Sequence, residues 1–110
     1  MNCTFIGLGN LGKELCGRIG LAGFSTFAYD LNPDASKNAA EQFKNVIQSD
    51  LTDAVKQSEV ILSCLPNSFL VREVVNKLIS EKGSLQNIKF GLIPLQDIPA
   101  NPKKLLKFSN

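Results

Sequence analysis

The chain has 110 residues, 44% of them hydrophobic and 20% charged, a balance typical of one soluble globular domain and not of a disordered segment. Its net charge of +2 is too small for the clustered basic face that nucleic acid or an anionic membrane would require, so neither is expected as a partner. The absence of histidine excludes an imidazole metal site and histidine acid–base catalysis, and no metal site is predicted.

The cysteines and the hydropathy of the sequence bear on where in the cell the protein is expected. Cys3, Cys16 and Cys64 lie in apolar segments without the Cys-x-x-Cys spacing of a metal or redox motif, and we interpret them as buried, reduced thiols. No stretch approaches the ~20 apolar residues that a bilayer requires. A strand-like run follows Met1 almost at once, without a basic or amphipathic leader. We therefore expect a cytoplasmic location.

Hydrophobic periodicity predicts alternating strands and helices. In chain order, the expected elements are a strand over 3–7, a helix over 10–22, a strand over 25–29, a helix from 33 to about 43, a brief strand at 46–47, a short helix over 51–56, a strand over 60–65 and a helix from 67 or 68 to about 83. The run over 60–65 is continuously apolar, as in strands buried on both faces of a parallel sheet.

This alternation predicts the fold class. Successive β-α-β units with right-handed crossovers form an open, doubly wound parallel sheet, so the chain is predicted to be a Rossmann-like α/β domain. A fifth strand over 88–93 is the last expected, which truncates the sheet after four or five strands. Because Pro94, Pro99 and Pro102 prevent a regular element, we expect a domain over 1–93 and a loose, lysine-containing tail over 94–110.

A glycine-rich loop lies between the first strand and the first helix. Gly7-Leu8-Gly9-Asn10-Leu11-Gly12 matches G-x-G-x-x-G, the pattern of dinucleotide-binding loops. The first glycine allows a tight turn, the second lets a pyrophosphate approach the backbone, and the third lets the helix pack closely. The helix N-terminus would attract the phosphates. Alone this pattern is weak, because glycines after a strand can serve only to turn the chain.

Asp30 strengthens that interpretation. It ends the second strand, eighteen residues after Gly12, where an acid accepts hydrogen bonds from the adenosine ribose hydroxyls. The alternative is an exposed cap ahead of Pro33. An acid at this position repels a 2′-phosphate, and neither Leu31 nor Asn32 supplies the arginine of NADP sites. We therefore expect NAD as the cofactor, with NADP less favoured.

A third segment lies where the strand over 60–65 ends. Leu65-Pro66-Asn67-Ser68 is expected at the carboxyl edge of the sheet, bordering the nicotinamide half of the cleft, although an ordinary strand-to-helix turn explains it equally well. Arg72 and Lys77 are interpreted as solvated surface charges. The predicted cofactor-binding residues are Gly7, Leu8, Gly9, Asn10, Leu11, Gly12, Asp30, Leu65, Pro66 and Asn67.

These motifs together resemble the β-hydroxyacid dehydrogenases, the group of 3-hydroxyisobutyrate dehydrogenase, glyoxylate and tartronate semialdehyde reductases and 6-phosphogluconate dehydrogenase. The segment Phe5–Gly12 is similar to the family's F-I-G-L-G-x-M-G, with Leu11 in place of methionine, and the resemblance covers residues 3 to about 82. It implies cofactor contacts around residues 8–11, at Asp30 and at Leu65-Pro66-Asn67. For the full-length family it implies hydride transfer between a nicotinamide cofactor and a small 3-hydroxy acid.

The C-terminal part departs from the family. The segment 93–99 does not match the family's substrate-binding Asp-x-Ser-Thr-type segment, and neither the catalytic lysine nor the helical second domain can be matched, so no catalytic residue is assigned. The favoured hypothesis is the NAD(P)-binding domain of a 3-hydroxyacid dehydrogenase, inactive alone. The alternatives are a stand-alone NAD(P)-binding sensor or partner-docking module, and a remnant without ligand affinity. An uncovered sheet edge could also support self-association or partner binding.

Overall fold

The computed structural model describes residues 2–65, 72–74, 76–77, 90–94, 98, 100–101 and 103–104. Its labelled elements are β1 (Asn2–Ile6), α1 (Asn10–Leu21), β2 (Ser25–Tyr29), α2 (Pro33–Gln42), β3 (Val46–Gln48), α3 (Leu51–Lys56), β4 (Val60–Ser63) and β5 (Phe90–Pro94). Residues 72–74 and 76–77 are also helical. None of the helices in this described part is long and apolar enough to cross a membrane.

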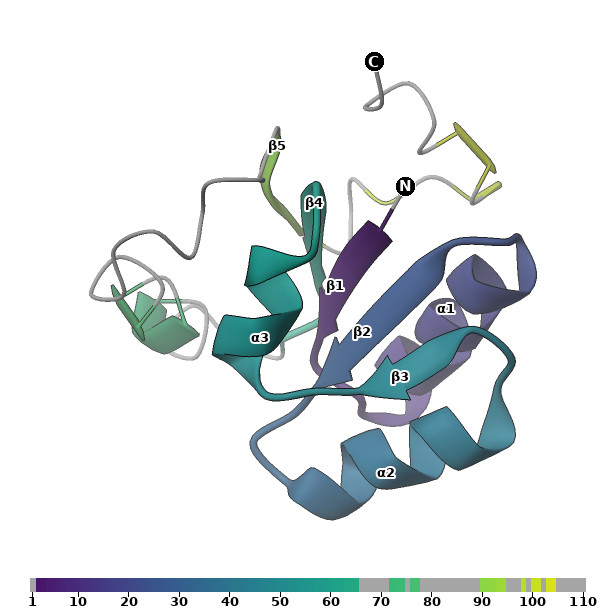
Figure 1. The fold of residues 1–110 in the computed structure, drawn as a ribbon, viewed down its shortest axis with the longest axis horizontal. Coiled ribbons are helices and arrows are strands. Elements are labelled where there is room, and N and C mark those ends of the chain that lie inside the picture. Colours follow the sequence, from purple (N-terminus) through teal and green to yellow (C-terminus); the bar gives the residue numbers. More distant parts are fainter. Residues whose placement is uncertain are drawn as a thin grey trace.

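The strands form one parallel sheet in the order β3-β2-β1-β4-β5 (Figure 1). The chain winds outward from β1 through β2 to β3, then returns to the other side of β1 for β4 and β5. This arrangement confirms the predicted doubly wound, Rossmann-like fold. Ile6 at the end of β1 is in register with Tyr29 of β2 and Ser63 of β4. The residues that follow these three strands therefore emerge together at the carboxyl edge, where the winding direction reverses.

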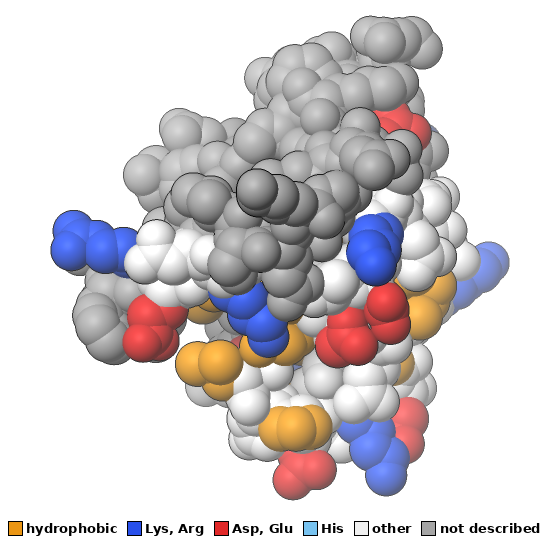
Figure 2. All heavy atoms as spheres, turned by 60° about the vertical axis from the view of Figure 1, so that its left-hand side comes forward, with side chains coloured by type: hydrophobic (Ala, Val, Ile, Leu, Met, Phe, Trp, Pro, Cys, Tyr) orange, Lys and Arg blue, Asp and Glu red, His pale blue; other side chains and the backbone are white. Residues whose placement is uncertain are grey.

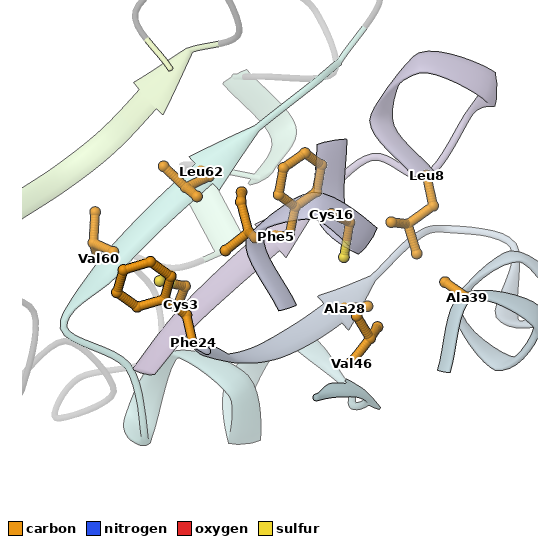
Figure 3. Close-up of a cluster of buried hydrophobic side chains, with 11 residues drawn as sticks. Cys3, Phe5, Leu8, Cys16, Phe24, Ala28, Ala39, Val46, Val60 and Leu62 are labelled. Carbon is orange, nitrogen blue, oxygen red and sulfur yellow. The ribbon is translucent and has the colours of Figure 1, made fainter. Parts of the chain in front are cut away.

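The two faces of the sheet are covered by different helices, because successive strand residues point to opposite faces. On one face, α1 and α2 pack on the strands. Figure 3 shows this first core cluster, which comprises Cys3, Phe5, Leu8, Cys16, Ile19, Phe24, Ala28, Ala39, Val46, Val60 and Leu62. On the other face, α3 and the helical residue Val74 pack on β1 and β4. This second core cluster comprises Ile6, Leu51, Val55, Ile61 and Val74.

The starts of α2 and α3 follow from local side-chain caps. The Asn32 side chain accepts a hydrogen bond of 3.0 Å from the Asp34 N–H, and Pro33 occupies the first turn of α2. The Asp50 carboxylate accepts a hydrogen bond of 2.8 Å from the Asp53 N–H at the start of α3. Both helix starts agree with the sequence prediction.

The structure differs from the predicted elements near the C-terminus. β4 ends at Ser63, two residues before the predicted end, and β5 includes Pro94, which pairs with Ser63. A proline is tolerated at the end of an edge strand because its missing N–H removes no essential ladder bond there. In the segment predicted as a loose tail, partly buried Ile98 packs against the first core cluster. Most of the helix predicted from 67 or 68 to 83 lies outside the described residues.

Candidate functional site

The glycine loop connects β1 to α1 through a turn that requires its first residue to be glycine. Gly7 has a φ of +97°, in the left-handed region that side chains disfavour. Its N–H donates a 3.0 Å hydrogen bond to the Tyr29 carbonyl, and a Cβ there would meet the Cys64 carbonyl oxygen. The turn is therefore tight against the ends of both neighbouring strands.

The other two glycines of the loop differ in their surroundings. A Cβ at Gly12 would overlap the Gly7 carbonyl oxygen, so the close approach of α1 to the loop excludes any side chain there. Gly9 has an ordinary φ of −64°, and a Cβ at this position would meet no atom of the described residues within 4 Å. Close packing thus excludes a side chain at Gly7 and at Gly12. Packing against the described residues does not exclude one at Gly9, although glycine also suits its N-cap position.

The N-terminus of α1 borders the open space beside Gly9 with N–H groups that have no partner within the helix. The first hydrogen bond of α1 runs 2.8 Å from the Lys13 N–H to the Gly9 carbonyl, so the N–H groups of Asn10, Leu11 and Gly12 have no partner within the helix. Gly9 provides no side-chain cap, and the first turn carries no acidic residue. The positive end of the helix dipole is therefore not compensated from within α1, which favours an anion.

The Asp30 side chain is hydrogen-bonded to the glycine loop. One of its carboxylate oxygens accepts a 2.7 Å hydrogen bond from the Leu8 N–H, and the other accepts a 2.9 Å bond from the Asn32 N–H. Because each carboxylate oxygen can accept more than one hydrogen bond, half-buried Asp30 retains capacity for a ligand hydroxyl. The cap of α2 is Asn32, so capping that helix is not the role of Asp30.

These elements enclose a cavity of about 1040 Å³ at the carboxyl edge of the sheet. Seven predicted site residues line it: Gly7, Gly9, Asn10, Leu11, Gly12, Asp30 and Leu65. Leu8 does not line it, because its side chain is buried in the first core cluster while its N–H holds Asp30. Pro66 and Asn67, also predicted, lie outside the described residues.

Among the described residues of the cavity wall, sequence reasoning missed nine: Ile6, Tyr29, Leu31, Leu51, Cys64, Glu73, Val74, Asn76 and Lys77. Tyr29, Leu31 and Cys64 could have been predicted, because each is next to a predicted site residue in the sequence. Lys77 was interpreted as a solvated surface charge. It is exposed, but its Nζ lies 5.8 Å from the centroid of the Tyr29 ring, and it forms part of the cavity wall. No local sequence signal links Lys77 to Tyr29, because the two residues are far apart along the chain.

The cysteine thiols are poor nucleophiles at neutral pH. Burial raises the pKa of Cys3 and of Cys16 to about 12, and the neighbouring Cys3 also raises that of Cys16. Burial likewise raises the pKa of Cys64, the thiol on the cavity wall. All three are free cysteines; Cys3 and Cys16 are buried as predicted, whereas Cys64 is only half-buried. Their protonated state at neutral pH gives the cavity no thiolate chemistry.

Charges of both signs are interspersed over the surface drawn in Figure 2, and the lysine and arginine side chains coloured there form no continuous basic patch on that face. The cavity wall itself carries Asp30, Glu73 and Lys77 among its described residues. Its remaining lining is largely apolar or glycine, as in sites that enclose a small organic ligand with a few polar anchors.

Comparison with known proteins identifies a family and relatives of this chain. The family model described as the NAD binding domain of 6-phosphogluconate dehydrogenase matches residues 2–95. Human mitochondrial 3-hydroxyisobutyrate dehydrogenase is 32% identical over 106 residues, which cover 94% of this chain and 30% of that protein. This chain thus spans about a third of the length of the curated relatives it matches.

Solved structures show the same similarity. A Mycobacterium tuberculosis 3-hydroxyisobutyrate dehydrogenase, solved with L-serine, superposes with a TM-score of 0.63 at 28% identity over 72% of this chain and 27% of its own. An imine reductase from Myxococcus stipitatus in complex with NADP+ shares the fold with a TM-score of 0.69 at 20% identity, over 86% of this chain and 32% of its own. The glycine loop, the sheet order and the family match agree, and the chain belongs to the family of the NAD-binding domain of 6-phosphogluconate dehydrogenase, which also includes its 3-hydroxyisobutyrate dehydrogenase relatives.

Proposed function

We propose that this chain binds NAD(H) in preference to NADP(H), as the cofactor-binding part of a 3-hydroxyisobutyrate dehydrogenase-like oxidoreductase. The observation that carries the proposal is the opening beside Gly9. A glycine with an ordinary φ and an empty Cβ position is explained by a ligand that approaches the backbone there. The adjoining N–H groups of Asn10 and Leu11 are suited to a pyrophosphate.

The bound nicotinamide would supply the hydride donor or acceptor, and the contribution of this chain is to bind and orient it. The N-terminus of α1 would hold the pyrophosphate, and the Asp30 carboxylate would accept hydrogen bonds from the adenosine ribose hydroxyls. The Leu8 N–H holds that carboxylate 2.7 Å away, in a fixed position beside the loop. Leu65, Pro66 and Asn67 would border the nicotinamide half.

The preference for NAD rests on the charge of Asp30. A 2′-phosphate replaces one of the hydroxyls that the carboxylate would accept and places a second anion beside it, which is repulsive. Among described residues, neither Leu31 nor Asn32, the two that follow Asp30, supplies a compensating cation. NADP(H) should therefore bind, but more weakly.

Calorimetric titration of the chain with NADH and NADPH tests the proposal. We expect dissociation constants between micromolar and millimolar, with the lower value for NADH. Asp30→Asn should weaken NADH binding and reduce the preference, because the amide carries no charge. Asp53→Asn is the matched control, since Asp53 is exposed on α3 and does not line the cavity. No binding at millimolar NADH would refute the cofactor proposal, and tighter NADPH binding would refute the role of Asp30.

We also propose that the chain alone does not turn over 3-hydroxy acids. It matches 30% of the length of the human relative, and hydride transfer needs a positioned acid and a substrate clamp that no residue here can be assigned to. Incubation with NAD and 3-hydroxyisobutyrate should give no NADH absorbance. Recovery of turnover on adding a helical dehydrogenase domain would support a dehydrogenase part, whereas saturable partner binding without turnover would favour a sensor or docking module.

Cytoplasmic location is the further part of this proposal. Three free cysteines, two of them buried, fit a reducing compartment. The curated relatives are named as mitochondrial enzymes, and the mitochondrial matrix is the competing location. Cell fractionation of a tagged chain distinguishes the two, and recovery with a matrix marker would refute the cytoplasmic assignment.

A further inference from the structure

We propose that Lys77 is a further dinucleotide-binding residue, whose ammonium group lies at the adenosine end of the cavity and makes a 2′-phosphate tolerable beside Asp30. This inference rests on the proposed function, which places the ribose at Asp30. It concerns discrimination between the two cofactors: Asp30 would disfavour NADP(H), and Lys77 would favour it.

The position of Lys77 follows from its contact with Tyr29. The Lys77 Nζ lies 5.8 Å from the centroid of the Tyr29 ring, within the range of a cation–π interaction. Tyr29 is half-buried and packs against the second core cluster, so the ring is a fixed platform. Tyr29 directly precedes Asp30 at the end of β2, and both residues line the cavity together with Lys77. We therefore assign the ammonium group to the ribose end of the cavity.

The electrostatics of the cavity wall give this ammonium group its effect. The described charged residues of the wall are Asp30, Glu73 and Lys77, so Lys77 is the single cation among them. A 2′-phosphate adds up to two negative charges at a place where Asp30 already repels it. Attraction by Lys77 offsets part of that repulsion. NADH, which carries hydroxyls at this position, gains little from the same cation.

The test compares the dissociation constants of NADPH and NADH for the whole chain and its variants. Lys77→Gln should raise the NADPH value about two- to fivefold, the range of an exposed ion pair, and leave the NADH value nearly unchanged. Lys77→Arg should retain the wild-type ratio. Lys44→Gln is the matched control, because Lys44 is exposed and does not line the cavity. High salt should reduce the effect of Lys77→Gln.

Each outcome bears on the proposal. An equal change for both cofactors in Lys77→Gln, an unchanged NADPH value, or the same change in Lys44→Gln would overturn the role of Lys77 while leaving NADH binding by the wild-type chain intact. Absence of binding of either cofactor to the wild-type chain would overturn the proposed function and this inference with it. Because the side chain is exposed, both variants should fold, and thermal unfolding checks this.

Discussion

Alanine substitutions at Gly9 and Gly12 should separate the requirements of the ligand from those of the fold. At Gly9 the new methyl group meets none of the described residues within 4 Å, and the φ of −64° suits alanine. Reduced freedom of the unfolded chain stabilises the protein by about 0.4–1 kcal/mol. Loss of glycine at the helix cap opposes this by about 0.5–1 kcal/mol. The free energy of unfolding should therefore change by less than about 0.5 kcal/mol.

At Gly12 the methyl group has no room. It would overlap the Gly7 carbonyl oxygen and lie 3.3 Å from the Cys64 Cβ, so the backbone of the loop or of α1 must move. Forcing a methyl group into a packed interior costs about 1–3 kcal/mol. For a domain of this size, each kcal/mol lowers Tm by roughly 4–8 °C. Gly12→Ala should therefore unfold at a clearly lower temperature than Gly9→Ala.

For Gly9→Ala we expect the opposite combination: NADH binding weakens, while the free energy of unfolding is nearly unchanged. The methyl group of Gly9→Ala occupies the space proposed for the pyrophosphate, and at least a tenfold weaker NADH affinity, about 1.4 kcal/mol, is expected without a loss of stability. Thermal unfolding and calorimetric titration of both variants provide the comparison. Unchanged NADH affinity in Gly9→Ala would refute a ligand at that position. A loss of stability in Gly9→Ala as large as in Gly12→Ala would show that the fold itself requires Gly9.

Three further predictions follow from the cavity, the core and the sheet edge. Glu73→Gln should tighten both dinucleotides about twofold, as the loss of one exposed like charge implies, and weaker binding in calorimetry would contradict this. Burial raises the pKa of Cys3 and of Cys16 from 9.0 to about 12 in the native state. Because the unfolded thiols lose their protons at lower pH than the native ones, the free energy of unfolding should fall as pH rises above about 9. Urea unfolding across this range should give a shallower fall for Cys16→Ala, and an identical fall would exclude the thiols as its cause. Self-association through an edge strand of the sheet, β3 or β5, should raise the sedimentation coefficient with concentration, and a constant monomer value would rule it out.

Local features of the sequence determined the fold class and most of the glycine loop. The period of the hydrophobic residues changes between strand and helix, and this change is legible over windows of a few residues. The caps at Asn32 and Asp50 act within three residues of themselves, so the starts of α2 and α3 were predictable. The spacing of Gly7, Gly9 and Gly12 is equally local.

The tertiary structure decided which of these residues meet. The Asp30 carboxylate accepts from the Leu8 N–H 22 residues earlier, and this contact depends on the parallel pairing of β1 with β2. Tertiary packing also closes the space beside Gly12 and leaves it open beside Gly9 among the described residues. The sequence alone does not distinguish these two positions, because both are glycine. Lys77 reaches the ring of Tyr29 because Val74, three residues earlier, lies in the second core cluster, against which Tyr29 also packs. Such contacts join distant parts of the chain, so no periodicity or motif encodes them.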